Sequence, residues 1–259
     1  MNDFPIRTYG RLKSRALKPR QAGLVEALLP HLAVPEGGAI DLDALFSLSP
    51  GGEGSGVGVK SFGDEGEASP FPLTPSPSRG GGTALEIGFG GGEHLVAQAG
   101  AEPDWRFIGA EPFLNGVGSC LRHIEESGVS NVRLHHGDAR DVLGRLPDGS
   151  LDLVYILFPD PWPKTRHWKR RLIQNDFIAE LARALKAGGE VRFATDWAHY
   201  AAWTLEMFQA GMFHGENSFE WIAECAADWR EPWPGHVATR YEQKRLGDCQ
   251  PIWLRFVRA

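Results

Sequence analysis

Short apolar runs alternate with segments of helical spacing after residue 82, and this alternation constrains the fold more than any other feature. Runs typical of β-strands cover residues 84–87, 106–110, 131–135, 151–158 and 190–195. Apolar residues at helical spacing cover residues 93–99, 113–124, 173–185 and 198–208, and Gly188-Gly189 should stop the third helix. This alternation predicts an α/β fold, in which a parallel sheet has helices on both faces and binds ligands at the carboxyl ends of its strands.

The two ends of the chain add further elements to this predicted domain. Near the C-terminus, Ile252, Leu254 and Phe256 alternate with polar residues, as in an edge or hairpin strand. Near the N-terminus, leucines at helical spacing between residues 19 and 32 predict a helix that docks on the main domain. The first 46 residues therefore form a region of their own, a basic arm followed by a docking helix.

Residues 47–82 differ in composition from the rest of the chain. Of these 36 residues, 22 are Gly, Ser or Pro. Such a segment buries too little apolar surface to offset the entropy of ordering it, so we interpret it as a disordered insertion. The chain then divides into the arm and docking helix at 1–46, the insertion at 47–82 and the folded domain at 83–259.

The charge of the chain is unevenly distributed. Its net charge of −6 argues against a protein that coats nucleic acid over its whole surface. Two segments are nevertheless basic, and their cations are Arg7, Arg11, Lys13, Arg15, Lys18 and Arg20 in the first, and Lys164, Arg166, Lys169, Arg170 and Arg171 in the second. If these patches share one face, they can bind the phosphates of a nucleic acid.

The remaining composition favours a protein of the cytoplasm. Cys120, Cys225 and Cys249 lie far apart, which argues against a disulfide framework or a structural zinc site. The histidines do not show the spacing of metal ligands, so we expect no metal. No apolar run reaches the length of a membrane span, and we expect no membrane partner. The sequence does not decide between a monomer and a homodimer.

A glycine-rich turn follows the first predicted strand. It contains Gly88 and Gly90 but has Glu93 where the dinucleotide-binding fingerprint requires its last glycine. A carboxylate at the start of the following helix also opposes the binding of a pyrophosphate. S-adenosylmethionine carries a sulfonium and an ammonium instead of phosphates, so it suits a turn with acids nearby. A plain glycine-rich turn without a ligand is the alternative.

Four acids lie at the ends of four successive predicted strands: Glu86, Glu111, Asp138 and Asp160. A carboxylate in the second of these positions can accept both hydroxyls of a ribose, and one in the third can accept from an adenine amino group. Each acid alone is more often a turn residue at the end of a strand. Together they indicate a site for a cationic nucleoside.

The fourth acid belongs to the unusual segment Phe158-Pro159-Asp160-Pro161-Trp162-Pro163-Lys164. Its prolines restrict the backbone and should hold Asp160 and Trp162 in fixed directions. A carboxylate beside a flat ring can hydrogen-bond and stack a base, and the cations that follow can hold phosphates. The alternative is a rigid turn followed by a solvated basic face.

With these residues, the chain resembles the bacterial tRNA (guanine-N7)-methyltransferase family, which has the class I methyltransferase fold. The resemblance rests on Arg7-Thr8-Tyr9-Gly10-Arg11, Glu86-Ile87-Gly88-Phe89-Gly90, the segment 158–164, Thr195-Asp196 and Thr239-Arg240-Tyr241-Glu242. It implies a Rossmann-like domain with a mostly parallel seven-stranded sheet, helices on both faces and a C-terminal antiparallel hairpin. The insertion departs from the family, whose N-terminal segment reaches the first strand by a shorter link.

The resemblance also implies an activity and a role for individual residues. The methyl group of S-adenosylmethionine would pass to N7 of the variable-loop guanine, conventionally position 46 of tRNA. The cofactor would be contacted by Glu86, Gly88, Gly90, Glu111, Asp138 and Asp160, and Asp160 would also be the catalytic residue. The target nucleotide would be contacted by Lys164, Asp196, Thr239, Arg240, Tyr241 and Glu242.

Several alternatives stay open at the level of sequence. Asp196 is equally well placed to cap the helix at 197–208, and Thr239 with Glu242 has the spacing of an exposed capping box. As a whole, the chain can also be a methyltransferase of the same fold that acts on another RNA base or a small molecule. A third possibility is an RNA-binding module without catalytic activity.

Overall fold

A computed structural model describes residues 16–47, 81–213 and 219–259. The motif at 7–11 and nearly all of the predicted insertion lie outside these residues. In the described part of the chain, no helix is both long enough and apolar enough to span a bilayer.

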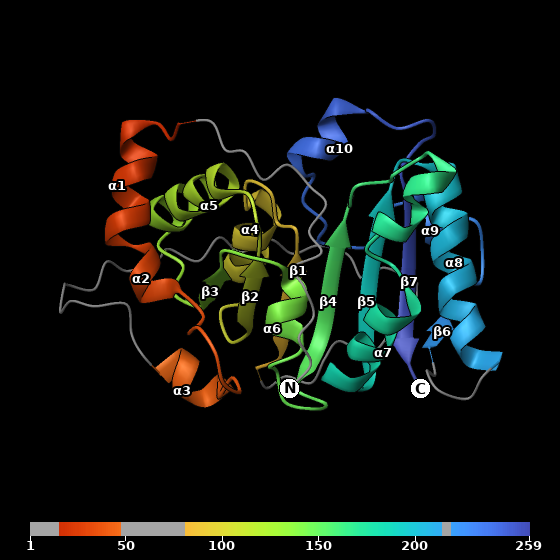
Figure 1. Ribbon diagram of the computed structural model, residues 1–259, viewed down its shortest axis with the longest axis horizontal. Coiled ribbons are helices and arrows are strands. Elements are labelled where there is room, and N and C mark those ends of the chain that lie inside the picture. Colours follow the sequence, from red (N-terminus) through yellow and green to blue (C-terminus); the bar gives the residue numbers. More distant parts are fainter. Residues whose placement is uncertain (1–15, 48–80, 214–218) are drawn as a thin grey trace, which may run out of the picture.

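Seven strands form one sheet in the order β3-β2-β1-β4-β5-β7-β6 (Figure 1). The strands are β1 (Thr83–Ile87), β2 (Arg106–Ala110), β3 (Val132–His135), β4 (Leu151–Leu157), β5 (Leu185–Thr195), β6 (Phe219–Trp221) and β7 (Ile252–Arg258). The first five are parallel, whereas β7 runs antiparallel to both β5 and β6. The predicted fold class, a mostly parallel seven-stranded sheet with a C-terminal antiparallel pair, is confirmed.

Helices cover both faces of this sheet. They are α1 (Pro19–Ala27), α2 (Leu29–Leu32), α3 (Leu42–Ser47), α4 (Glu93–Ala101), α5 (Leu114–Ser127), α6 (Ala139–Leu143), α7 (Asn175–Ala184), α8 (Ala198–Phe213), α9 (Ala227–Arg230) and α10 (Arg240–Lys244), with a 3-10 helix η1 at Thr165–Arg170. Side chains of β4 alternate between two hydrophobic clusters, as a strand buried on both faces requires. Leu153 and Tyr155 pack with residues of α4 and α5, and Val154 and Ile156 with residues of α6, α7 and α8.

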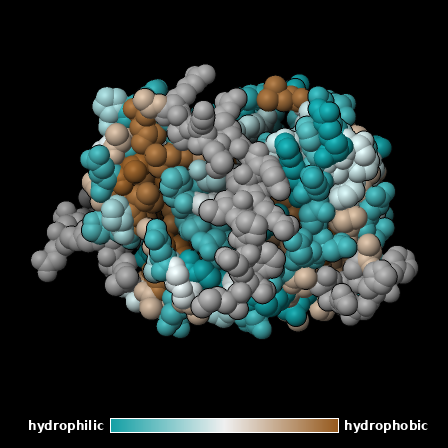
Figure 2. All heavy atoms as spheres, in the orientation of Figure 1, coloured by the Kyte–Doolittle hydropathy of each residue, from teal (hydrophilic) through white to brown (hydrophobic). Residues whose placement is uncertain are grey.

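The docking helix predicted for residues 19–32 is divided into α1 and α2. The division falls at Leu28, two residues before Pro30, which has no N–H to continue the helical hydrogen bonds. Helix α1 packs against α5, where Leu24 joins the hydrophobic cluster and Arg20 pairs with Glu125 at 2.7 Å. Hydrophobic side chains gather on the surface where α1 lies against α5 (Figure 2).

The end of the helix predicted for residues 173–185 was wrong. Helix α7 ends at Ala184, and the chain becomes extended at Leu185, before the two glycines. Leu185 pairs with Leu151 of β4, and a register shift follows before the regular pairing begins at Glu190. Gly188, with φ at +77°, lies within this irregular start of β5 and does not end the helix.

Candidate active site

Five acidic residues lie at the carboxyl edge of the parallel strands. The strand order reverses between β1 and β4, which is where sheets of this kind bind ligands. Glu86 is the penultimate residue of β1, and Glu111 follows β2 directly. Asp138, Asp160 and Asp196 follow β3, β4 and β5. The structure therefore brings the predicted acids to one edge of the sheet.

The glycine-rich turn connects β1 to α4 in a conformation that needs glycine. Gly88, Gly90 and Gly92 have φ values of +71°, +55° and +80°, which side chains with a Cβ rarely adopt. The amide of Gly88 donates to Ala110 at 2.8 Å, and that of Gly90 donates to Glu111 Oε2 at 2.8 Å. The turn is thereby attached to the carboxyl end of β2.

Glu111 is buried and accepts hydrogen bonds from two backbone amides. Gly90 and Phe113 donate to its two oxygens, each at 2.8 Å. Burial raises the pKa of Glu111, the two amides act in the opposite direction, and the charges of Asp160 and Glu86 raise the pKa further. Three carboxylates thus accumulate negative charge beside the glycine turn.

Glu86 is only 3% exposed, and its carboxylate faces a histidine. Its Oε2 lies 2.8 Å from Nδ1 of His94, which is 1% exposed. The His94 ring lies 5.5 Å, between centroids, from the ring of His236, whose Nε2 is 2.8 Å from Glu242 Oε2. His94, in the first turn of α4, thus lies between Glu86 of β1 and the His236–Glu242 pair. Sequence reasoning missed both histidines, which have no motif of their own.

Asp138 has a local structural role at the end of β3. Its Oδ1 accepts the amide hydrogen of Arg140 at 2.9 Å and caps α6. Its Oδ2 lies 3.6 Å from the guanidinium of Arg140. A carboxylate has about four acceptor positions, so capping a helix does not by itself prevent such a group from accepting from a ligand.

The segment around Asp160 contains two residues in strained backbone conformations, each directly before a proline. Phe158 and Trp162 both lie in the left-handed region, with φ values of +51° and +42°, a conformation that costs energy in residues other than glycine. The amide of Phe158 donates to Ala194 of β5 at 2.8 Å. Asp160 itself is exposed between these two residues.

The basic segment that follows divides into exposed and buried cations. Lys164, Arg166 and Lys169 are exposed. The guanidinium of Arg170 lies over the ring of Trp162, 5.1 Å from its centroid. Arg171 is only 1% exposed, so the expectation that it holds a phosphate was wrong.

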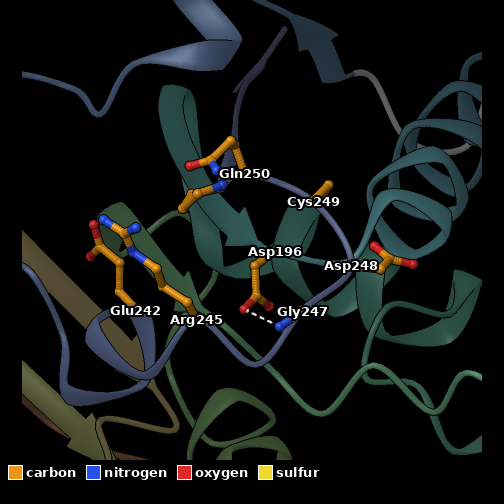
Figure 3. A pocket seen from close by; sticks show the side chains of 8 residues that line it. Asp196, Glu242, Arg245, Gly247, Asp248, Cys249 and Gln250 are labelled. Atoms are coloured by element: carbon orange, nitrogen blue, oxygen red, sulfur yellow. Dashed lines mark hydrogen bonds between the residues drawn. The ribbon is translucent and has the colours of Figure 1, made fainter.

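Asp196 lines a cavity of about 290 Å³ together with Glu242, and Arg245 lies between them in Figure 3. Its Oδ2 accepts the amide hydrogen of Gly247 at 2.7 Å. The amide of Ala198, at the start of α8, donates instead to Asp248 at 2.9 Å. Asp196 therefore does not cap this helix, and its carboxylate lies at the cavity wall.

Residues of the Thr239–Glu242 motif begin α10, which lies beyond the carboxyl ends of β4 and β5 (Figure 1). Thr239 Oγ1 accepts the Glu242 amide hydrogen at 3.2 Å, which is one half of the predicted capping box. The other half does not form, because the carboxylate of Glu242 pairs with His236.

The two middle residues of the motif reach the glycine turn. Arg240 pairs with Glu93 of α4 at 2.5 Å. Tyr241 is 54% exposed as a residue, and its ring lies so close that a Cβ at Gly90 would be 3.5 Å from it. The predicted nucleotide-binding motif and the predicted cofactor turn therefore meet. Among the described residues, no group of three or more His, Cys, Asp or Glu side chains is arranged to hold a metal ion.

Comparisons with known proteins agree with this geometry. A family model described as "Putative methyltransferase" matches residues 81–254. The chain is 50% identical over 254 residues to a tRNA (guanine-N(7)-)-methyltransferase of Caulobacter sp. (strain K31), which covers 98% of this chain and 96% of that one. A protein of the same name from Hyphomonas neptunium is 42% identical over 252 residues, 97% of this chain and 99% of that one. The resemblance drawn from the motifs is confirmed, and the chain belongs to the tRNA (guanine-N(7)-)-methyltransferase family.

Proposed function

We propose that this protein transfers a methyl group from S-adenosylmethionine to N7 of a guanine in tRNA. The observation that carries the proposal is the meeting of two sets of residues at one edge of the sheet. One set is the glycine turn with the carboxylates of Glu86, Glu111 and Asp160, and the other is α10 with its cavity at Asp196 and Glu242. The names of the relatives support tRNA as the substrate.

The charge of the glycine turn suits S-adenosylmethionine. Glu111 has a raised pKa because it is buried and because Asp160 and Glu86 repel its charge. A cationic ligand would relieve this repulsion, whereas a dinucleotide phosphate would add to it. Gly88, Gly90 and Asp138 would complete the set that holds the cofactor. When bound, S-adenosylmethionine supplies a methyl group on a positively charged sulfur.

The cavity at α10 suits a guanine. The Watson–Crick edge of guanine presents two adjacent hydrogen-bond donors, which a carboxylate can accept and which adenine lacks. Asp196 and Glu242 both line the cavity, and Thr239 and Arg240 fix the helix that carries Glu242. The exposed ring of Tyr241 offers a face for a base.

Phosphate contacts would come from the exposed part of the basic segment. Lys164, Arg166 and Lys169 all follow the Asp160 segment and are exposed. A nucleotide held by its base at Asp196 and by its phosphates at these cations would be oriented over the sheet edge. By the family resemblance, we assign the target to the variable loop, at position 46, and we expect the protein to act in the cytoplasm, where mature tRNA is found.

The chemistry requires alignment more than proton transfer. N7 of guanine has an in-plane lone pair and no proton at neutral pH, so no general base is needed at that atom. Holding two reactants in line supplies about 7–11 kcal/mol in well-oriented systems. Asp160 would orient the base and stabilise the positive charge that develops on it, as a preorganised charge does.

One experiment separates this function from the alternatives. The protein is mixed with methyl-labelled S-adenosylmethionine and an unmodified tRNA transcript, or with the same transcript carrying adenine at position 46. We expect label as 7-methylguanosine in the first transcript only. Label in both transcripts would indicate a different target base, and tRNA binding without any transfer would indicate an RNA-binding module. Calorimetric binding of NAD in place of S-adenosylmethionine would contradict the cofactor assignment.

A further inference from the structure

Arg171 is a buried cation inside a segment of exposed ones. Its residue surface is 1% exposed, and in the described part of the chain no carboxylate lies within ion-pair distance of its guanidinium. A buried charge is costly unless other groups stabilise it. The position of Arg171 therefore needs an explanation other than binding to solvent or phosphate.

Three aromatic rings surround the guanidinium. Its central carbon lies 5.1 Å from the ring centroid of Trp168, 5.0 Å from that of Tyr200 and 5.1 Å from that of Trp203. Aromatic faces attract cations, and the attraction is stronger where water is excluded. Both terminal nitrogens also lie 3.3 Å from Nδ1 of His199, which must accept because a guanidinium only donates. Three of these four residues belong to α8.

The third nitrogen of the Arg171 guanidinium points to the segment around Asp160. Its Nε donates to the carbonyl oxygen of Pro161 at 3.0 Å. Pro161 directly follows Asp160, and the left-handed residues Phe158 and Trp162 lie on either side of this pair. Strained backbone of this kind persists only where the surrounding structure holds it in place.

Arg171 thus joins the strained segment to a fixed part of the molecule. Helix α8, which supplies most of the aromatic cage, begins at Ala198, two residues after Asp196, where Asp248 accepts the Ala198 amide hydrogen. The cage therefore relates the position of Asp160 to the start of the helix that follows Asp196.

We propose that Arg171 is a positioning residue, whose caged guanidinium holds the Pro161 carbonyl and thereby fixes the direction of the Asp160 carboxylate. The proposal rests on the proposed function in one respect, because it takes Asp160 as the catalytic residue. It assigns Arg171 no contact with tRNA or with the cofactor.

The test is Arg171→Ala with chemical rescue. Removing the side chain leaves a cavity between aromatic rings that suits a free guanidinium ion. We expect kcat for tRNA methylation to fall about 100-fold, since a misplacement of about 1 Å costs this much in oriented reactions. The KM for tRNA and its salt dependence should stay within about twofold, and millimolar guanidinium chloride should restore much of kcat, whereas methylammonium chloride should not.

Arg133 provides the matched control. It is another buried arginine, 2% exposed, whose Nε donates to the Leu45 carbonyl at 2.9 Å and whose guanidinium lies 4.8 Å from the Phe46 ring centroid. It lies on β3, away from the Asp160 segment. Arg133→Ala should lower stability and leave kcat unchanged, with no rescue by guanidinium.

Hydrogen exchange gives a readout that does not depend on tRNA methylation. In Arg171→Ala, the four backbone amides of segment 158–164 (Phe158, Asp160, Trp162 and Lys164) should exchange faster than in the wild type and should slow again when guanidinium is added. If the wild type methylates no tRNA but this exchange pattern holds, the proposed function fails while the positioning role stands. If Arg171→Ala does not fold, Arg171→Lys keeps the charge without the planar donor group, and it should show the same loss of kcat at unchanged KM.

Other outcomes would overturn the proposal. An unchanged kcat in a folded Arg171 variant would show that the Pro161 contact does not matter for the reaction. A rise in the KM for tRNA with a smaller salt dependence would show that Arg171 meets phosphate. A loss of kcat and of stability that guanidinium does not restore, with unchanged exchange at residues 158–164, would reduce Arg171 to a core residue like Arg133.

Discussion

Asp248 accepts the amide hydrogen of Ala198 at 2.9 Å and so stabilises the start of α8, although Asp196 lies much nearer in the sequence. This pairing separates two roles that the sequence placed on one residue. Both residues line the cavity that Glu242 also lines, but the carboxylate of Asp248 bonds to the start of α8, whereas that of Asp196 accepts from Gly247.

The first prediction tests this separation. Asp248→Ala should lower the free energy of unfolding by about 1 kcal/mol, the usual effect of losing a helix cap, and should keep most of the methylation activity. Asp196→Ala should reduce methylation at least about 10-fold, because the carboxylate that we propose as an acceptor for the guanine edge is lost. Urea unfolding and single-turnover methylation would measure the two effects. Equal losses of activity in both variants would contradict the division of roles.

The second prediction concerns Asp160. Asp160→Ala should cost roughly 2.7–4 kcal/mol of transition-state stabilisation, as the removal of one preorganised electrostatic group does. Asp160→Asn should be nearly as damaging, because it keeps the shape and loses the charge. Steady-state kinetics and a tRNA binding assay would show a loss of turnover at nearly unchanged tRNA affinity.

The pH profile of the same variants tests the mechanism. Since no proton leaves N7 during the reaction, the wild-type rate should not climb as the pH rises through neutrality. A climb in the wild type that disappears in Asp160→Asn would show that Asp160 removes a proton, and it would refute the mechanism proposed above.

The third prediction concerns the exposed cations. Single Ala variants of Lys164, Arg166 and Lys169 should weaken tRNA binding and reduce the slope of log affinity against log salt by under about 1 per lost phosphate contact. Their affinity for S-adenosylmethionine should not change. Lys186→Ala is the control, because Lys186 pairs with Asp152 at 2.8 Å at the opposite edge of the sheet. Unchanged slopes in all three variants would show that these cations are only solvated.

The fourth prediction follows from the raised pKa of Glu111. Its ordinary value is 4.5, and burial raises it in the folded protein. The folded state therefore binds this proton more tightly than the unfolded state does, so the contribution of Glu111 to stability is largest at low pH. It is lost as the pH rises from the ordinary pKa through the raised one.

The same shift predicts proton release on cofactor binding. A cationic ligand lowers the pKa of Glu111, so binding between the ordinary and the raised pKa should release a proton. Calorimetry in buffers of different ionisation enthalpy would detect it, and Glu111→Gln should abolish the effect. Proton uptake in the wild type would contradict a cation at this position.

Much of the fold could be predicted from the sequence because its signals are local. The run at 151–158 is apolar except at Asp152, as expected of a central parallel strand, and its residues 151–157 form β4. The division of the N-terminal helix also had a local signal, since Pro30 cannot continue the helical hydrogen bonds. The start of β5 had none, because Leu185 is extended only through its pairing with Leu151.

Site residues also divide into those with a local sequence signal and those without one. The glycines and acids at strand ends could be predicted as site residues because the strands themselves could be predicted. The burial of Arg171 was not visible, because five cations in one short segment look alike until Tyr200 and Trp203, about thirty residues later, enclose one of them. The histidines at 94 and 236 are adjacent only through the folded sheet.

The antiparallel direction of β7 has a consequence for what the sheet can recognise. Because Ile252, where β7 begins, pairs with Thr195, where β5 ends, the connection from β6 must finish at the carboxyl edge. A last strand in the parallel direction would have needed a connection that returns to the amino edge. Each parallel strand contributes to the site only the turn that follows it. Because β7 is reversed, the connection that precedes it contributes further side chains at the same edge. Helix α10, which Thr239 caps, precedes β7 and lies at this edge, where the ring of Tyr241 is close to Gly90.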